Sequence, residues 1–255
     1  MSMLKTPEQI ELMRDAGRVV ANALAAVKEH AAVGVSLKEL DDVAAAVMSD
    51  AGARPAFLDY HPRWAAVPFP GVICASVNDA VVHGIPNGYV LEDGDLLSVD
   101  CGAFLEGWCG DAAISFIVGD GDPLDQELID ATEAALARGV EAARVGNKMG
   151  DLAYAIGGEA KRAGYGLLAD HGGHGIGRTM HAEPPVPNIG RPGRGMKLEE
   201  GLVIAIEPML ILGGKDDYYH DEDEWTLRSA NGQRAAHSEH TVAITADGPM
   251  ILTLP

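Results

Sequence analysis

Two aspartates within residues 95–118 are the first residues whose spacing suggests chemistry. The segment has the pattern of two strands joined by a tight turn. If Leu105 and Glu106 form that turn, Asp100 and Asp111 lie directly opposite each other, between apolar neighbours. Two carboxylates this close repel unless a cation or a shared proton compensates. The pair is therefore a surface feature, an acid–base dyad or part of a metal site.

Further carboxylates and one histidine favour the metal site. Glu207 ends the apolar run "GLVIAIE", and Glu239 precedes the run "HTVAIT". Each glutamate taken alone could equally be a structural ion-pair partner. Together with Asp100, Asp111 and His174 they supply four carboxylates and one imidazole. This set suits two divalent cations with open positions for water, and its mostly oxygen ligation favours Mn, Fe(II), Co or Zn.

The stretch "DHGGHGIGRTMH", residues 170–181, contains three histidines that are candidate metal ligands, proton carriers or loop residues. The glycines around His174 let the backbone approach closely, so His174 is the expected ligand. His181, seven residues further on, is expected to act on a substrate instead. His171 is expected to be a loop residue or, at most, a donor to a metal ligand.

Helix-capping patterns define the elements that must position these residues. They predict helices that begin at Thr6, Ser36 and Asp122, and a fourth helix over about residues 151–164. Strand-like segments lie between residues 72 and 118. Beyond residue 165, glycine-rich loops alternate with short apolar runs such as "LVIAIEPMLIL".

An internal repeat indicates how these elements are organised. Val33–Gly52 aligns with Val145–Gly164 at five of twenty positions, a match that small residues at helix ends can also produce by chance. Each copy follows a helix and precedes strands. The pattern predicts an α+β chain of two pseudo-symmetric halves, approximately 1–120 and 121–255, within a single domain spanning 1–255, and a cleft where the halves meet.

Composition excludes several classes of function. The chain has 255 residues, 47% of them hydrophobic, and a formal charge of −19 from 19 basic and 38 acidic residues. Such a surface repels phosphate backbones, so nucleic acid is not expected as a direct partner. The sequence shows no membrane span and no signal peptide. Three scattered cysteines, at positions 74, 101 and 109, form no disulfide framework, and a cytoplasmic protein is expected.

The candidate ligands occur in an order that resembles the type I methionine aminopeptidases. The matching motifs are "VNDAVVHGIP" (77–86), "SVDCG" (98–102), "GD" (110–111), "GGHGIG" (172–177), "IEPM" (206–209) and "EHT" (239–241). The resemblance covers nearly the whole chain. It implies the pita-bread fold, with a central antiparallel sheet and outer helices. The lack of a zinc-finger extension or a long helical insertion resembles the short bacterial form.

The resemblance implies a role for each residue of the site. Asp111 and Glu239 would bridge the two metals, Asp100 would complete the first metal site, and His174 and Glu207 the second. A metal-bridging water would attack the peptide carbonyl, and Glu207 would relay its proton to the leaving amine.

Two further histidines match family positions that act on the substrate. His83 resembles the histidine that hydrogen-bonds the scissile amide. His181 resembles the one that stabilises the oxygens derived from the carbonyl.

The substrate implied by the resemblance is a nascent polypeptide that begins with methionine and has a small second residue. A methionine side chain requires a soft apolar pocket. By position, Cys74, Phe69, Met180 and Trp225 match residues that line it, and Tyr60 is a further candidate. The segment 60–74 is a few residues longer than usual, so Trp64 is an alternative to Tyr60.

Three features depart from the family or have no assigned role. Ala112 stands where many relatives have threonine, which removes one hydroxyl near the metals. The acidic stretch from Lys215 to Trp225 is expected to be a solvated hairpin tip, and it disfavours docking on RNA during any transient ribosome contact. Cys109 shares a strand face with Asp111 but is not expected to be a ligand, because the oxygen-rich set is complete without it.

Two alternatives remain beside a monomeric methionine aminopeptidase. A prolidase or X-Pro aminopeptidase has the same fold but usually carries an additional N-terminal domain. A binding module that has lost catalysis is the other alternative, and the intact set of five ligands argues against it.

Overall fold

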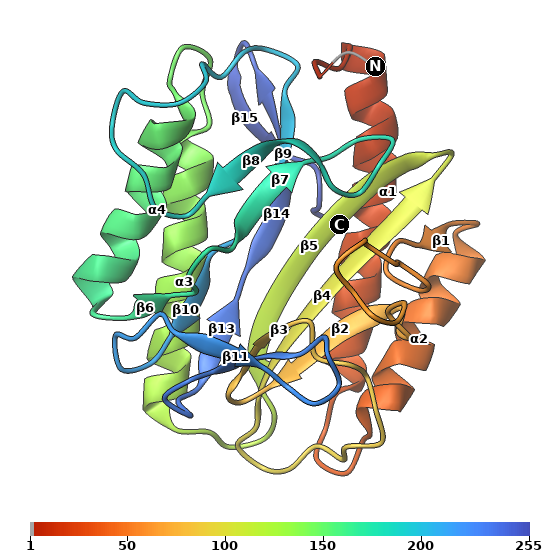
Figure 1. Cartoon of the computed structure of the whole chain (residues 1–255). Coiled ribbons are helices and arrows are strands. Elements are labelled where there is room, and N and C mark those ends of the chain that lie inside the picture. The colour runs from red at the N-terminus through yellow and green to blue at the C-terminus, as the bar shows by residue number, and fades with distance from the viewer. Residues whose placement is uncertain (1–2) are drawn as a thin grey trace.

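Two pairs of helices, the first two and the last two along the chain, cover one face of a curved sheet near its two ends (Figure 1). The structure is a computed structural model and describes residues 3–255. The helices are α1 (Pro7–His30), α2 (Leu37–Asp50), α3 (Pro123–Ala142) and α4 (Met149–Ala163). The strands are β1 (Arg54–Pro55), β2 (Ile73–Val77), β3 (Ala80–Val82), β4 (Leu96–Leu105), β5 (Trp108–Ile117), β6 (Gly166–Leu167), β7 (Gly172–Gly175), β8 (Ala182–Pro187), β9 (Val203–Ile206), β10 (Met209–Ile211), β11 (Tyr218–His220), β12 (Leu227–Ser229), β13 (Ala235–His237), β14 (Glu239–Thr245) and β15 (Gly248–Ile251).

The helix starts predicted from capping patterns are confirmed. Thr6 and Gln9 form a reciprocal capping box at α1, and Ser36 and Glu39 form one at α2. Asp122 caps α3 by accepting a hydrogen bond from a backbone N–H two residues on. The fourth helix begins at Met149, two residues before the predicted start. Local side-chain chemistry therefore fixes where the helices begin.

The main sheet has nine strands and joins the two halves of the chain. Its order is β1-β4-β5-β14-β9-β7-β8, with β2 also paired to β4 and β15 to β14, and every pairing is antiparallel. Strand β5 from the first half pairs with β14 from the second, through Ala113 opposite Glu239 and Ala112 opposite His240. The centre of the sheet is thus the seam between the halves.

The predicted repeat is visible in the backbone. Gly34 and Gly146 stand at equivalent positions of the aligned segments, and both have φ of 95°. Two residues later, Ser36 and Lys148 cap α2 and α4, and each forms an isolated antiparallel bridge with a later part of its own half. The same turn, cap and helix therefore occur once in each half, as the pseudo-symmetry predicts.

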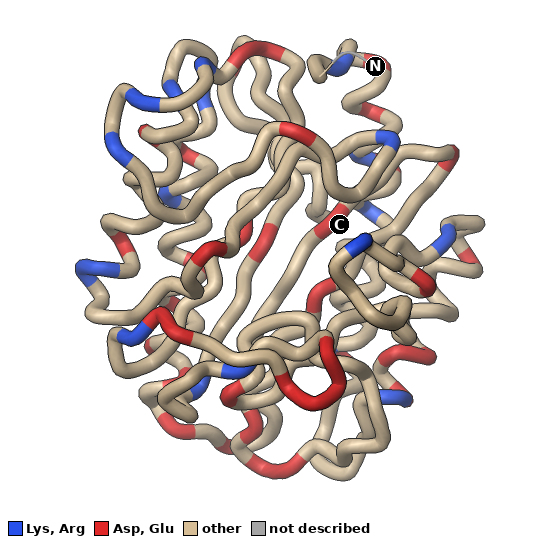
Figure 2. Tube along the Cα trace, in the orientation of Figure 1, with Lys and Arg blue, Asp and Glu red and all other residues tan. Residues whose placement is uncertain are grey.

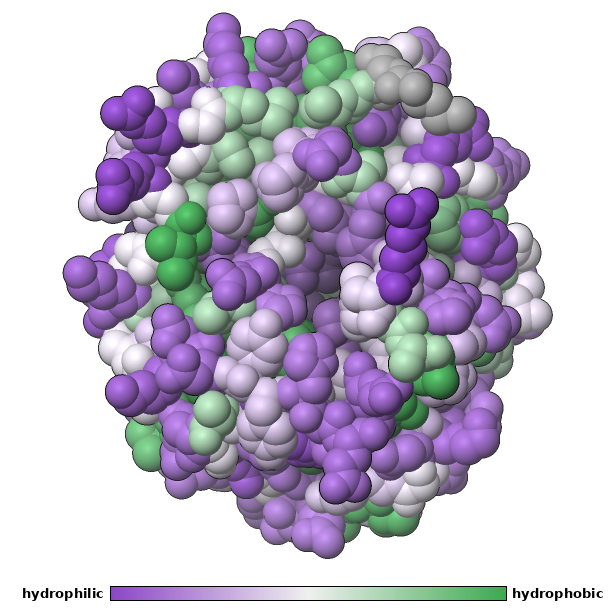
Figure 3. Space-filling view, in the orientation of Figure 1, coloured by the Kyte–Doolittle hydropathy of each residue, from purple (hydrophilic) through white to green (hydrophobic). Residues whose placement is uncertain are grey.

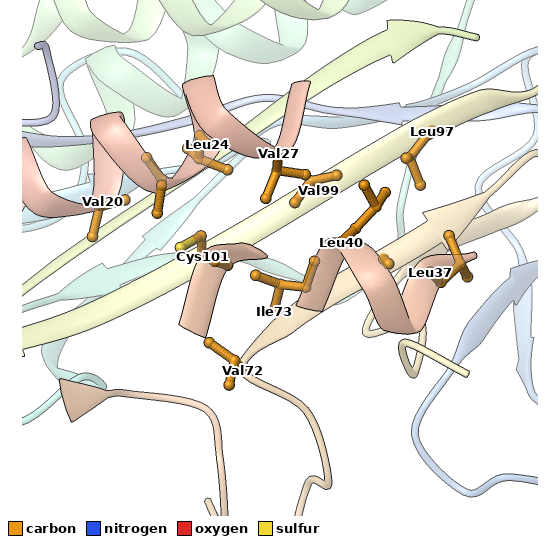
Figure 4. Close-up of a cluster of buried hydrophobic side chains, with 14 of the residues drawn as sticks. Val20, Leu24, Val27, Leu37, Leu40, Val72, Ile73, Leu97, Val99 and Cys101 are labelled. Atoms are coloured by element: carbon orange, nitrogen blue, oxygen red, sulfur yellow. The ribbon is translucent and has the colours of Figure 1, made fainter. Parts of the chain in front are cut away.

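Each half buries its own apolar cluster between helices and sheet. Figure 4 shows side chains of α1 and α2 packed against β2 and β4, among them Val20, Leu24, Leu40, Ile73 and Val99. In the second half, another cluster packs α3 and α4 against strands that include β9, β10 and β14. Within residues 3–255 no helix combines the length and apolar character needed to cross a bilayer.

The predicted register of the β4–β5 hairpin is wrong, because the turn lies one residue later than the predicted Leu105-Glu106 turn. Glu106 and Gly107 form the turn, with φ of 50° and 76°, so Asp100 lies opposite Ala113 and Asp111 opposite Gly102. A two-residue turn with both φ positive favours glycine at its second position, and only this placement puts Gly107 there. The two aspartates share one face of the sheet as diagonal neighbours rather than as a directly opposed pair.

A close helix–strand contact lies beside Asp111. A Cβ atom on Gly110 would come within 2.8 Å of the Cα of Gly17 in α1. The absence of side chains at both positions lets the helix approach β5 closely. The contact holds β5 against α1 on one face of the sheet, and Asp111 projects from the other face.

Candidate metal centre and active site

Every residue predicted for the site lines a single cavity of about 320 Å³. The view in Figure 3 is hollowed near the middle of the molecule, and its walls there are mostly hydrophilic. The lining residues are Phe57, Tyr60, Trp64, Phe69, Cys74, His83, Asp100, Asp111, His174, Met180, His181, Glu207, Trp225 and Glu239. Carboxylates and histidines form one part of this lining, and aromatic and sulfur-containing side chains form the other.

The five predicted metal ligands come from five neighbouring strands. Asp100 lies in β4, Asp111 in β5, Glu239 at the start of β14, Glu207 directly after β9, and His174 in β7. This sequence of strands is the order in which they pair across the sheet. Adjacent strands are about 4.8 Å apart, so one inward-facing ligand from each strand produces a compact cluster. The sheet topology therefore assembles residues that are far apart in the sequence.

Ligand atoms within this cluster are close enough to share metal ions. One atom from each of Asp111, His174 and Glu239 lies within 4.8 Å of the others, and the same holds for Glu207, His237 and Glu239. His174 Nε2 is 3.9 Å from Asp111 Oδ2 and 3.7 Å from Glu207 Oε1. Glu239 belongs to both groups, a position suited to a bridging carboxylate.

The buried oxygens of the cluster fit divalent cations. Asp100 Oδ1, Asp111 Oδ1 and Glu239 Oε1 are buried, and none has a hydrogen-bond partner. Burial and the neighbouring carboxylates raise the pKa of Asp100 and Glu239, and burial raises the pKa of Asp111 to about 7. Buried carboxylates of this kind are normally paired or bound to metal. Cations at this position would compensate the charges and use the free oxygens.

Glu207 differs from the other carboxylates. Burial opposes its ionisation, but His237 and His174 together lower its pKa below the usual range. Its Oε2 lies 3.6 Å from His237 Nε2. His237 was not predicted from the sequence, although it stands two residues before Glu239, and that spacing places both side chains on one face of an extended chain. The first histidine of "HSEH" would have been found by that alternation.

His83 and His181 flank the carboxylate cluster as neutral imidazoles. Burial lowers the pKa of each to about 4. The ring of His181 lies 4.3 Å from that of His174, measured between centroids. Its Nδ1 is 2.9 Å from the hydroxyl of Tyr60, which leaves Nε2 for another partner. Both histidines are placed where they can donate a hydrogen bond beside the metal cluster.

The apolar part of the cavity is built from aromatic rings. Phe69 packs edge-on against Trp225 with centroids 5.2 Å apart, and Phe57 packs against Phe69 at 6.4 Å. Cys74 and Met180 complete this wall, and both are buried. Phe57 was missed, because nothing in its sequence context separates it from an ordinary core residue. This half suits an unbranched apolar side chain.

Tyr60 and Trp64 were alternatives in the sequence, and both line the cavity. Tyr60 contacts His181, whereas the ring of Trp64 packs 5.1 Å from Trp225. The two aromatic residues occupy separate parts of the wall. The segment 60–74 therefore contributes Trp64 to the cavity wall in addition to Tyr60, not in its place.

Three residues considered in the sequence lie outside the cavity lining. His171 bonds Ala169 O through Nδ1 at 2.8 Å, and its ring packs against His83. Cys109 is buried in an apolar cluster. Ala112 packs on the helix side of the sheet, and the hydroxyl that bonds the backbone of Asp111 belongs to Thr241.

The acidic stretch contains β11 and the turn that leads to β12, where Figure 2 shows a continuous acidic segment. Asp221 pairs with Arg228, and Asp223 accepts hydrogen bonds from Thr226 and the Trp225 N–H. Two of its carboxylates thus stabilise the turn. The hairpin holds Trp225 at the cavity wall.

Comparisons with known proteins agree with this arrangement. Residues 11–246 match Metallopeptidase family M24. Methionine aminopeptidase 1 of Mycobacterium tuberculosis is 50% identical over 253 residues, which cover 96% of this chain and 92% of that protein. A methionine aminopeptidase of Aquifex aeolicus is 44% identical, with 98% of both chains covered.

Solved structures show the same pita-bread fold. The crystal structure of methionine aminopeptidase from Thermotoga maritima superposes with a TM-score of 0.94, 36% identity and 99% coverage of both chains. Prolidase from Pyrococcus furiosus gives a TM-score of 0.79 at 25% identity, and the match covers 99% of this chain but 66% of the prolidase. This chain belongs to the methionine aminopeptidases of metallopeptidase family M24.

Proposed function

We propose that this protein is a metal-dependent aminopeptidase that removes the N-terminal methionine from polypeptides with a small second residue. One observation carries the proposal: five metal-ligating side chains meet at one part of a cavity whose other part is apolar and aromatic. The relatives that are named methionine aminopeptidases support the same activity. The free N-terminus would enter the cavity, and the remaining chain would leave through its mouth.

The metal ions would be held by Asp100, Asp111, His174, Glu207 and Glu239. When bound, divalent ions supply a Lewis acid and make a coordinated water acidic enough to act near neutral pH. Two clusters of candidate ligand atoms in the cavity share Glu239, so its carboxylate would help to hold a metal ion in either cluster, and Asp111 would contribute to one of them. Mn, Fe(II), Co and Zn all accept this set of oxygen and nitrogen donors.

The chain's own residues would handle the protons and the substrate oxygen. Glu207 is ionised at neutral pH because of its neighbouring histidines, so its carboxylate can accept a proton and pass it to the leaving amine. His83, neutral at this pH, would donate a hydrogen bond to the scissile amide. His181, held at Nδ1 by Tyr60, would donate from Nε2 to the oxygen that gains negative charge.

The apolar pocket supports methionine as the first residue. Phe69, Cys74, Met180 and Trp225 offer soft, polarisable surface, which suits a thioether side chain. An X-Pro aminopeptidase or prolidase is the second candidate because it shares the fold. The lower identity to the prolidase and the aromatic pocket for an unbranched first residue favour the methionine aminopeptidase.

Activity on defined peptides tests this proposal. Metal-free protein is titrated with Mn, Fe(II), Co and Zn, and release of the first residue is measured from Met-Ala-Ser and from Ala-Pro. We expect release of methionine and no cleavage of Ala-Pro. His174→Ala should abolish methionine release while circular dichroism shows an unchanged fold. Cleavage restricted to Ala-Pro would favour the second candidate, and unchanged turnover by the variant would contradict the metal assignment.

We also propose a setting for this activity. One cavity contains all the predicted site residues and draws them from both halves of the chain, which supports one catalytic unit over residues 1–255. Cytoplasmic location follows from the expected substrate, a nascent polypeptide, and a monomer with transient contact to the ribosome suits that substrate. Gel filtration and ribosome co-sedimentation would test the last two points.

A further inference from the structure

The segment between β1 and β2 carries an exposed tryptophan at the cavity. Figure 1 shows this segment beside β4, to which both β1 and β2 are paired. Trp64 lines the cavity, yet 62% of its surface is exposed, whereas Phe69 and Trp225 are 2% and 4% exposed. Leu58 and Val67 in the same segment are also exposed. A large ring left in water at the edge of a binding cavity indicates a contact that a ligand completes.

The loop that carries Trp64 is tied down at several points. Its ends are closed by hydrogen bonds from Asp59 N to Phe69 O and from Phe69 N to Tyr60 O, both 2.9 Å. Within the loop, the Trp225 indole N–H donates to Val67 O at 3.1 Å. Prolines at 62, 68 and 70 further restrict the loop. Trp64 is therefore displayed on a restrained loop, and little ordering entropy is needed to bind a ligand there.

The position of Trp64 along the cavity wall indicates which part of a substrate would contact it. Rings follow one another from Phe57 through Phe69 and Trp225 to Trp64, with centroid separations of 6.4, 5.2 and 5.1 Å. The first three rings are buried and the last is exposed, so Trp64 stands at the mouth. In an aminopeptidase only the first residue occupies the buried part, and the chain that follows must pass the mouth.

We propose that Trp64 forms a subsite for the side chain of the third substrate residue and gives the enzyme a preference for an aromatic or large apolar residue there. The inference rests on the proposed function. The second residue of that substrate is small, so the third side chain is the first large group to reach the rim. An aromatic ring packed against an indole gains both buried apolar area and an edge-to-face contact.

Tetrapeptides that differ only at the third residue test the inference. The specificity constant kcat/KM is measured for Met-Ala-Trp-Gly and Met-Ala-Gly-Gly with the metal-loaded enzyme. We expect the wild type to favour the tryptophan peptide about tenfold, and Trp64→Ala to reduce this ratio to about twofold or less. Trp64→Phe should retain most of the preference. Tyr154→Ala, which removes an exposed aromatic residue of α4 away from the cavity lining, is the matched control and should keep the full ratio.

The outcomes separate this inference from the proposed function. If Trp64→Ala lowers kcat/KM equally for both peptides, the ring only supports Trp225, and the inference is wrong. A wild-type kcat/KM ratio near one for the two peptides also overturns it. So does a Trp64→Ala loss of kcat/KM that depends on the first residue, appearing with norleucine at that position but not with methionine. If the wild type releases no methionine from either peptide with any of the metals, the proposed function itself fails.

Discussion

Substitution of a metal ligand should stabilise the metal-free protein, and Asp111 offers the clearest case. Burial raises its pKa from 3.8 to about 7, and its side chain is almost fully enclosed. A carboxyl whose pKa is raised in the folded state contributes stability at low pH and loses it as the pH rises through the folded value. The contribution of Asp111 to the stability of the metal-free protein should therefore fall between about pH 4 and pH 7.

The size of the effect follows from the shift. Roughly three pKa units correspond to about 4 kcal/mol of unfolding free energy from this one group. Asp111→Asn keeps the shape of the side chain and remains uncharged. At pH 8 and without metal it should be more stable than the wild type by on the order of 4 kcal/mol, and near pH 4 the two should be similar.

Urea unfolding in the presence of a chelator measures this difference at pH 4.5 and pH 8. Glu29→Gln, which changes an exposed carboxylate of α1, is the control and should follow the wild type at both values. With metal at about 100 times the dissociation constant, this difference at pH 8 should narrow to on the order of 1 kcal/mol, because binding adds about 2.7 kcal/mol to the wild type. A stability difference between Asp111→Asn and the metal-free wild type that does not grow from pH 4.5 to pH 8 would refute the reasoning.

Three further substitutions test other contacts. Tyr60→Phe removes the hydrogen bond to His181 and should lower kcat about tenfold at unchanged thermal stability; unchanged kcat would show that the bond does not orient the ring. Gly110→Ala would place a Cβ against Gly17 and should cost about 1–3 kcal/mol in urea unfolding, and a neutral result would mean that α1 can shift. Asp41→Ala leaves two buried backbone N–H groups at the start of β2 unpaired and should cost roughly 2–4 kcal/mol, against no change if water replaces the carboxylate.

Helix starts could be predicted from the sequence because they depend on short-range patterns. The capping residues Thr6 and Ser36 act on backbone groups within three positions, so the sequence contains the whole interaction. The register of the β4–β5 hairpin was harder, since a turn placed one residue earlier still puts both aspartates on one face. The residue that separates the two registers is Gly107, because a turn with two positive φ angles favours glycine at its second position.

The remainder of the site depends on contacts between distant segments. His237 and Phe57 reach the centre through strand pairing and loop closure, and each has the local pattern of a core residue. The contact of Tyr60 with His181 joins residues 121 positions apart. The place of Trp64 beside Trp225 likewise depends on how a loop closes. Such contacts are set by tertiary packing, which a single sequence does not display.

The seam between β5 and β14 also constrains when the site can exist during synthesis. Asp111 donates its backbone N–H to Thr241, 130 residues later, and the pairing that brings Glu239 beside Asp111 occurs in the same place. Contacts of such high sequence separation form late, because the chain must close a long loop before they are gained. A growing chain that has not yet released β14 from the ribosome holds at most part of the ligand set. The protein therefore acquires its metal centre, and with it the proposed activity, only after its own synthesis has passed β14.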